Sequence, residues 1–452
     1  MNGVNKIIMK KRDQWSSNFG FLMAAAGSAV GLGNLWKFPY VVGMNGGGIF
    51  IIAYVILLVL LGAPILMSEM AIGRNTRLNP IGACNKIKNG WGFVGGLGVL
   101  GAFIILCYYS VIGGWVLKYL FKYIISSSID NPSEYFKNFT ESIYEPILWH
   151  ITFAIICIII VMKGISGGIE KISKIFLPML AVFIIIIAIN VIKLPNALNG
   201  LKFFIIPDLS AVSSFSDIFS ILLNAMGQVF FSLSLGMGTL ITYGSYLSRS
   251  SNIQKNSLYI PVFDLIIALL ACTAILPAVF AFNLEPTAGS GLLFNTLPYV
   301  FDHMKYGKYL AVIFFLLVFF AAVTSAISLI EVIASYFIDN MKWSRKKACI
   351  IPGIGFILLG TAASLSFGIF NKIRFFGHSI FDMLMILSDK IIMPIGGLCI
   401  CILVGYIWKT KNMFEELSSG GLYKVYFKKT LTFLIKFFAP VMIIIIFITS
   451  FF

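Results

Sequence analysis

Long apolar runs follow one another along almost the whole chain, separated by short polar segments. Many of them are about as long as a helix needs to cross the hydrocarbon core of a bilayer, roughly 20 residues, and they lack the alternation of a transmembrane β-strand. Because a helix satisfies its own backbone in lipid, the pattern predicts an all-α integral membrane protein. Eleven transmembrane helices are expected, at about 16–41, 47–72, 92–125, 147–162, 169–190, 217–248, 257–282, 309–339, 347–366, 379–408 and 430–451.

Two of these spans are interrupted by residues that weaken a helix. The first contains Gly31, Gly33 and Asn34 before Pro39, and the sixth contains SLSLGMG at 232–238. Glycines that allow close packing of helices would account for one such break. Two breaks five spans apart, each beside hydroxyl or amide side chains, instead favour a transporter built from an inverted repeat, with its binding site at the breaks.

Composition and charge agree with this class. Of 452 residues, 59% are hydrophobic and 12% are charged, whereas soluble domains carry about 25% charged residues. The net charge is +16, but no polar stretch is long enough to form a basic soluble domain. A nucleic-acid partner is therefore not expected. Most loop Lys and Arg residues lie in alternate connections, at 74–91, 163–174, 249–256, 340–347 and 409–429. Because cytoplasmic loops collect these residues, the N-terminus is expected in the cytoplasm and the C-terminus outside.

The sequence shows no motif of an enzyme or of a resident metal site. The seven cysteines lack metal-like spacing, and most lie in apolar runs as small core residues would. The three histidines fall at or near loops, and no metalloprotease or serine hydrolase motif is present. A channel would need a continuous polar pore, which two broken spans do not supply. The remaining alternative is a relative of a transporter that senses its ligand without moving it.

Four motifs, in this order, carry a family resemblance: GSAVGLGNLWKFPY at 27–40, NGGG at 45–48, GQVFFSLSLGMG at 227–238 and AAVTSAIS at 321–328. The chain resembles the neurotransmitter:sodium symporters, most closely the bacterial branch that carries aromatic and other hydrophobic amino acids. LeuT-type transporters are themselves the type case of the inverted-repeat architecture. The resemblance implies a first repeat at 1–190, a second at 191–408 and a loop with an eleventh span at 409–452. It also implies sodium-driven amino acid uptake in the bacterial cytoplasmic (inner) membrane, with lipid around the protein and no organic cofactor.

The resemblance implies a substrate site at the two breaks. The substrate carboxylate would bind the amides of Leu32 and Gly33 and the Tyr109 hydroxyl. The amino group would meet carbonyls of Ala29, Phe231 and Ser232 and polar groups of Ser234. The side chain would enter a pocket of Ile105, Tyr109, Phe231, Met237, Ser325 and Leu329. Because this pocket is mostly apolar, a hydrophobic amino acid fits it best, and the flexible Met237 predicts tolerance of large side chains.

The resemblance also implies two sodium sites, which as hard-cation sites would be built from oxygen ligands. The first would use the Ala29 carbonyl, Asn34, Ser232, Asp264 and the substrate carboxylate. Because the substrate is itself a ligand of the ion, sodium and substrate would each strengthen the binding of the other. The second would use the carbonyls of Gly27, Val30 and Ala321 with Thr324 and Ser325. Thr and Ser side chains in a helix ordinarily donate hydrogen bonds to carbonyls of the same helix. Thr324 and Ser325 are therefore expected to bind sodium only because the broken first span would lie beside them.

Asp264 is the most informative single residue, because an acid in the middle of a span is costly and functional by default. The commoner family pattern has Asn here. Some members need chloride nearby, at positions that match Tyr54, Gln228, Ser232 and Ala268, and Ala268 lacks the hydroxyl that a chloride site uses. We therefore expect chloride independence, with Asp264 supplying the negative charge. The alternative is that Asp264 takes up a proton for the return step.

The resemblance further implies gates on either side of the site. Arg12 with Trp15, facing Asp339, would close the cytoplasmic side, and Lys37 and Gln228 would lie at the outer gate. The family's usual acid partner in the tenth span aligns with Met385, so the sequence leaves the partner of Lys37 unassigned.

Overall fold

The structure is a computed structural model that describes residues 13–126, 128–208, 212, 214–284 and 291–449. Arg12, expected at the inner gate, lies outside these residues. Nine helical segments in the described part are long and apolar enough to cross a membrane. They are α3–α4 (Gly48–Thr76), α6 (Gly92–Ile125), α8 (Tyr144–Met162), η3–α9 (Ile165–Val191), α13 (Ile253–Ala281), α15 (Gly307–Met341), α16 (Arg345–Leu365), α17–η7 (Ile380–Ile407) and α20–α21 (Lys428–Thr449).

The two remaining predicted spans are the broken ones. The first consists of α1 (Asn18–Ala29) followed by η1 and α2 (Gly33–Met44), and its halves are bent by 50°. The sixth is divided between α11 (Phe215–Ser232) and α12 (Thr239–Ser245). The described residues contain no strand, only two isolated bridges. The all-α prediction is therefore confirmed, and the order of elements is consistent with eleven spans.

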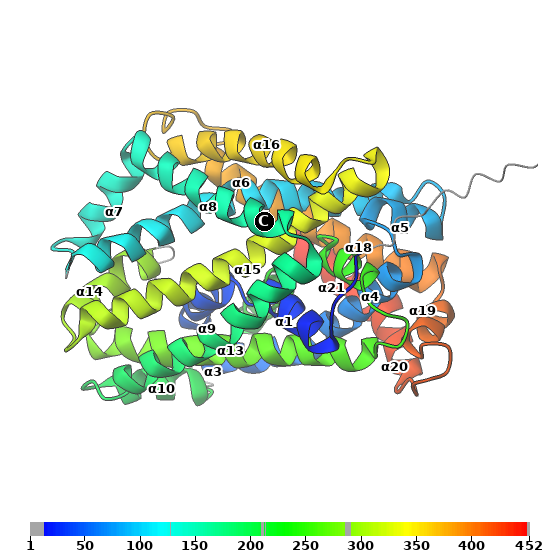
Figure 1. Cartoon of the computed structure of the whole chain (residues 1–452). Coiled ribbons are helices and arrows are strands. Elements are labelled where there is room, and N and C mark those ends of the chain that lie inside the picture. Colours follow the sequence, from blue (N-terminus) through cyan, green and yellow to red (C-terminus); the bar gives the residue numbers. More distant parts are fainter. Residues whose placement is uncertain (1–12, 127, 209–211, 213, 285–290, 450–452) are drawn as a thin grey trace, which may run out of the picture.

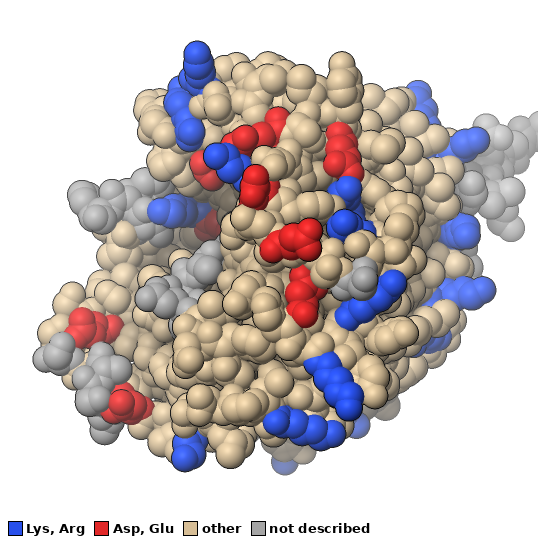
Figure 2. Space-filling model, turned by 90° about the vertical axis from the view of Figure 1, so that its left-hand side faces the viewer, with Lys and Arg blue, Asp and Glu red and all other residues tan. Residues whose placement is uncertain are grey.

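The connecting helices gather at two opposite ends of the molecule (Figure 1). The short helices α5 (Pro80–Ile87) and α19 (Thr410–Leu417) lie at one end, beside α20 (Lys428–Phe433) at the start of the last span, and α7 (Pro132–Glu141), α10 (Ala197–Ile205) and α14 (Leu297–Asp302) lie at the other. This arrangement is what spans that cross in alternating directions require. Figure 2 shows the end with α7, α10 and α14, where acidic side chains lie among the basic ones.

The breaks occur where the backbone needs conformations or space that only small residues allow. In the second break Gly236 and Gly238 have φ of 76° and 72°, a region that glycine adopts without steric cost. In the first break a Cβ on Gly31 would lie 2.5 Å from the Ser325 hydroxyl oxygen. The glycines therefore let the interrupted first span approach α15 closely, and α1 packs against α9, α13 and α15 in the centre of the protein.

A buried arginine fastens the end of α4 (Ala63–Thr76) to the helix before the last span. The Arg74 guanidinium is 1% exposed, and its Nε lies 2.6 Å from Oε1 of Glu416 in α19. Arg74 also donates to the backbone carbonyls of Ser251 and Glu416. Three segments that are distant in the sequence thus share one cation.

We expect Glu416→Ala to destabilise the fold, because it leaves the Arg74 charge buried without its acid. Breaking a fully buried pair costs about 3–5 kcal/mol. Glu416 is 18% exposed, so solvent screening reduces the expected cost to about 2 kcal/mol. Thermal unfolding in detergent should show a melting temperature lower by several degrees. The double variant Arg74→Met/Glu416→Ala should recover part of the loss, and equal melting temperatures for Glu416→Ala and the parent would contradict this role.

Candidate functional site

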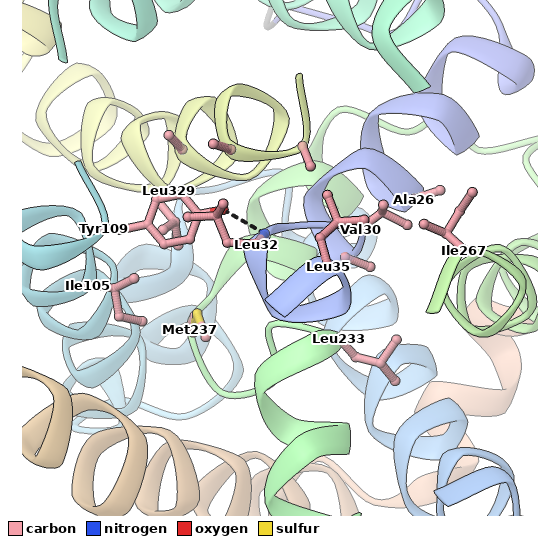
Figure 3. Close-up of a cluster of buried hydrophobic side chains, with 14 of the residues drawn as sticks. Ala26, Val30, Leu32, Leu35, Ile105, Tyr109, Leu233, Met237, Ile267 and Leu329 are labelled. Carbon is pink, nitrogen blue, oxygen red and sulfur yellow. Dashed lines mark hydrogen bonds between the residues drawn. The ribbon is translucent and has the colours of Figure 1, made fainter. Parts of the chain in front are cut away.

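The two breaks and two unbroken spans enclose one buried cavity. Its lining includes every residue that the sequence assigns to the substrate: Ala29, Leu32 and Gly33 from the first break, Ile105 and Tyr109 from α6, Phe231, Ser232, Ser234 and Met237 from the second break, and Ser325 and Leu329 from α15. Figure 3 shows Ile105, Met237 and Leu329 around the Leu32 end of the break, with Tyr109 beside it. Segments far apart in the sequence therefore converge on one mostly apolar space.

The cavity is small in this structure, with a volume of about 30 Å³. That space holds only one or two water molecules. An aromatic amino acid needs far more room, so side chains around the cavity must move when a substrate enters. Met237 is unbranched and is flanked by Gly236 and Gly238, which makes it the most adaptable part of the wall.

Polar groups converge at the first break. The Leu32 amide donates a hydrogen bond to the Tyr109 hydroxyl oxygen at 3.2 Å (Figure 3). The unwound backbone beyond α1 leaves amides without partners in its own helix, and such groups favour anions. The Tyr109 hydroxyl and the Leu32 amide are thus placed to hold a carboxylate together.

Asp264 lies beside this cavity and is completely buried in α13. Its Oδ1 accepts hydrogen bonds from Asn34 Nδ2 at 2.7 Å and from the Ser232 hydroxyl at 2.8 Å. Its Oδ2 accepts one from the Tyr54 hydroxyl at 2.8 Å. The structure therefore brings together the three side chains expected at the first sodium site, and Ala29 lies at the adjoining end of α1. An all-oxygen, acid-containing set of this kind suits a hard cation.

The residues expected at the second sodium site also meet, where α1 contacts α15. The Ser325 hydroxyl lies 3.5 Å from the Gly27 carbonyl oxygen and 3.2 Å from that of Ser28. The Thr324 hydroxyl donates to its own helix, to the Phe320 and Ala321 carbonyls, as an ordinary helical threonine would. Val30 follows α1 with ψ of 90°, so its carbonyl has already left the helix.

The structure supplies the outer acid that the sequence left unassigned. Lys37 Nζ lies 3.4 Å from Oδ2 of Asp389, which is one turn beyond Met385, so the acid that faces Lys37 in this chain lies one turn after the position where the family's acid aligns. Lys37 also lies 4.2 Å above the ring of Phe231. This pair borders an outer cavity of about 150 Å³ that shares Leu32, Gly33, Tyr109 and Phe231 with the inner one.

Gln228, the other expected outer residue, is buried, and neither polar atom of its side chain has a hydrogen-bond partner among the described residues. The structure therefore gives it no bond to Lys37 or Asp389.

We expect Asp389→Asn to open the outer cavity more often. The pair is 34% and 18% exposed, so it contributes at most about 1 kcal/mol, or about a fivefold change in the opening equilibrium. A Met385→Cys reporter in a Cys399→Ser background should then react about five times faster with a water-soluble thiol reagent. Asp382→Asn is the matched control, because Asp382 caps α17 through Ser379. Equal labelling rates in the Asp389→Asn and control proteins would rule out this role for the ion pair.

On the opposite side of the site, aromatic and charged contacts hold the start of the first span. The Trp15 indole donates to the Tyr243 carbonyl at 3.1 Å. Asp339 accepts a hydrogen bond from the Asn79 backbone amide at 2.8 Å. Sequence reasoning missed a further set here, in which Arg345 pairs with Asp13 and with the buried Glu331.

Sequence reasoning also missed Glu69 in α4, which is completely buried. Its Oε1 accepts a hydrogen bond from the Gly236 amide at 2.8 Å, so this acid binds the backbone of the second break. Glu69 and Glu331 are acids inside apolar spans, and that signal, which identified Asp264, would have found them too.

Comparison with known proteins agrees with this geometry. The model of the sodium:neurotransmitter symporter family matches residues 12–131 and 124–452. The chain is 35% identical over 446 residues to the uncharacterized sodium-dependent transporter YhdH of Bacillus subtilis, covering 97% of this chain and 98% of that one. It is 38% identical to an uncharacterized sodium-dependent transporter of Haemophilus influenzae, covering 98% and 99%.

A solved structure is similar over nearly the whole fold. The crystal structure of MhsT in complex with L-phenylalanine is 39% identical in sequence and covers 97% of this chain and 100% of its own, with a TM-score of 0.89. The matched family model, the full-length relatives and the two facing breaks lead to one conclusion: the chain belongs to the sodium:neurotransmitter symporter family, as a sodium-coupled transporter with a LeuT-type fold.

Proposed function

We propose that this protein takes up hydrophobic and aromatic L-amino acids together with sodium, by alternating access across the bacterial cytoplasmic membrane. The observation that carries the proposal is the single buried cavity that all eleven substrate-site residues line. Its walls are mostly apolar, as a hydrophobic side chain requires. The similarity to MhsT, whose structure holds L-phenylalanine, supports the same class of substrate. The N-terminus would lie in the cytoplasm and the C-terminus outside.

The polar end of the cavity would bind the backbone of the amino acid. Its carboxylate replaces the contact between the Leu32 amide and the Tyr109 hydroxyl, which lie 3.2 Å apart. Its ammonium group meets carbonyls at the ends of α1 and α11, where helix C-termini carry partial negative charge. Each end of the zwitterion thus meets backbone groups that the breaks have freed.

Sodium binding would couple to the substrate through the first site. The substrate carboxylate lies beside Asn34, Ser232 and Asp264 and completes the set of oxygens around the ion. Each ligand therefore raises the affinity of the other. A second ion between α1 and α15, at Gly27, Val30, Ala321, Thr324 and Ser325, would hold the first span against the unbroken α15.

Chloride independence is part of the proposal. Asp264 carries a fixed negative charge beside the first ion, and its carboxylate accepts three hydrogen bonds. The Tyr54 and Ser232 hydroxyls that would otherwise bind an anion are already engaged by this acid.

Uptake into liposomes tests the proposal. Labelled tyrosine, tryptophan and leucine are offered under an inward sodium gradient, once with chloride and once with gluconate. We expect concentrative uptake that requires sodium and is equal in both anions. Binding without uptake would favour the amino acid sensor, and a requirement for chloride would refute the role of Asp264 while leaving the family unchanged.

A further inference from the structure

A lysine lies inside the last span without an acid partner. Lys436 belongs to η8 (Leu434–Phe438), eight residues beyond the start of α20, which is about 12 Å along a helix axis. No carboxylate among the described residues lies within 4 Å of it, whereas two other lysines within spans, Lys37 and Lys118, pair with Asp389 and Glu145. An ionisable residue inside a span costs free energy unless a partner compensates it.

The surroundings of Lys436 place its ammonium group near the membrane surface. Nζ lies 5.3 Å from the ring of Tyr406, whose hydroxyl donates to the Lys436 carbonyl at 2.7 Å. Tyr406 is 48% exposed and is followed by Trp408 and Lys409, where the span ends. Tyrosine and tryptophan concentrate at the level of lipid headgroups, so the lysine head lies close to that level.

Helix direction supports this placement. Side chains of a helix lean toward its N-terminus, and the N-terminus of α20 is at the same end of the molecule as α5 and α19 (Figure 1). The apolar stem of Lys436 contacts the position of Gly405, where an added Cβ would lie 3.2 Å from Lys436 Cγ. The stem therefore packs between the last two spans while the charged end reaches outward, as snorkelling lysines do.

More positive charge lies in the segment that leads from the tenth span into the last one. This segment and the first two residues of the last span hold five exposed lysines and only two acids, and one of the acids, Glu416, is paired with Arg74. The Thr410 and Thr432 hydroxyls lie 3.4 Å apart and join the two segments. The lysines are Lys409, Lys411, Lys424, Lys428 and Lys429.

We propose that the surface where η7 (Leu403–Ile407) packs against η8 binds the phosphate of an anionic phospholipid headgroup, with Lys436 as its central contact. The acyl chains would lie along the exposed apolar faces of the two spans, which include Phe433 and Phe437. A basic pocket between spans, bordered by interfacial aromatics, is the arrangement that recognises anionic headgroups. The lipid then supplies the counter-charge that the protein lacks at Lys436.

Native mass spectrometry of the full chain, titrated with phosphatidylglycerol or phosphatidylcholine, tests this site. We expect tighter binding of phosphatidylglycerol, weakened about fivefold by Lys436→Gln, since one lysine near the surface contributes about 1 kcal/mol. Lys436→Arg should keep the affinity. The matched control is Lys305→Gln, because Lys305 lies over an exposed tyrosine, Tyr306, in the same way but away from η7 and η8.

A second variant, Lys428→Gln/Lys429→Gln, leaves the interior of the span unchanged and should also weaken phosphatidylglycerol binding. Excess inorganic phosphate should not displace the lipid. The proposal is overturned if Lys436→Gln binds phosphatidylglycerol as the parent does, or if phosphatidylcholine binds equally well. Displacement of the lipid by inorganic phosphate would also overturn it, in favour of a site for free anions.

Discussion

Replacing Asp264 with serine should convert chloride-independent uptake into uptake that requires chloride. The substitution removes a buried carboxylate that accepts hydrogen bonds from Asn34, Tyr54 and Ser232. Losing the acid of a buried charge pair costs about 3 kcal/mol or more, so sodium affinity in gluconate should fall about a hundredfold. Serine leaves space beside the freed Tyr54 and Ser232 hydroxyls, and a chloride ion there would restore the negative charge. Sodium-driven uptake by liposomes, measured against chloride concentration, shows the change.

Asp264→Asn is the control that tests whether chloride needs the space left by the shorter serine side chain. It removes the charge but fills the same volume, so chloride has no room and uptake should stay low in both anions. Full uptake by both variants in gluconate would show that Asp264 is not the counter-charge of the first ion. If uptake by the parent protein drives proton efflux and Asp264→Asn abolishes it, the carboxyl acts as a proton carrier, the alternative that the sequence left open.

Tyr109→Phe should weaken substrate binding about 30-fold. The variant keeps the ring in the cavity wall and removes the hydroxyl that lies 3.2 Å from the Leu32 amide. A hydrogen bond to a charged group contributes about 2 kcal/mol, which corresponds to a factor of about 30. Equilibrium binding of labelled phenylalanine in saturating sodium measures the loss.

Tyr108, the residue before Tyr109, provides the matched control. The Tyr108 hydroxyl donates to Asp389 at 3.2 Å in the outer cavity and does not line the inner one. Tyr108→Phe should therefore change phenylalanine affinity far less. Equal effects of the two substitutions would mean that the Tyr109 hydroxyl does not bind the carboxylate.

The sequence predicted the fold because its two strongest signals are local. A run of apolar residues predicts a span from its length alone. The glycines mark where the two breaks occur, whichever other helices pack against them. The ends of the spans differ from the prediction by only a few residues, as at 147–162 against Tyr144–Met162. The division into repeats at 190 and 408 stays a prediction.

Contacts between distant side chains were harder to predict. Lys37 meets Asp389 because the tenth span carries this acid one turn beyond the aligned position, and only the packing of the first span against the tenth shows which turn faces Lys37. The Glu69 contact with Gly236 depends on how α4 packs against the second break. By contrast, the acids themselves were visible in the sequence, since Glu69, Glu331 and Asp389 all lie within apolar spans.

Phe231 is one of the residues that line both the inner and the outer cavity, and its ring lies so close to Gly33 that a Cβ there would be 2.5 Å away. A substrate larger than the inner cavity would gain room if this ring moved toward the outer cavity, beneath Lys37. Because Lys37 lies 4.2 Å above this ring, the volume of the substrate would then affect the outer ion pair. Two amino acids of equal affinity but different volume would then be carried at different speeds, so discrimination among substrates would arise in turnover as well as in binding.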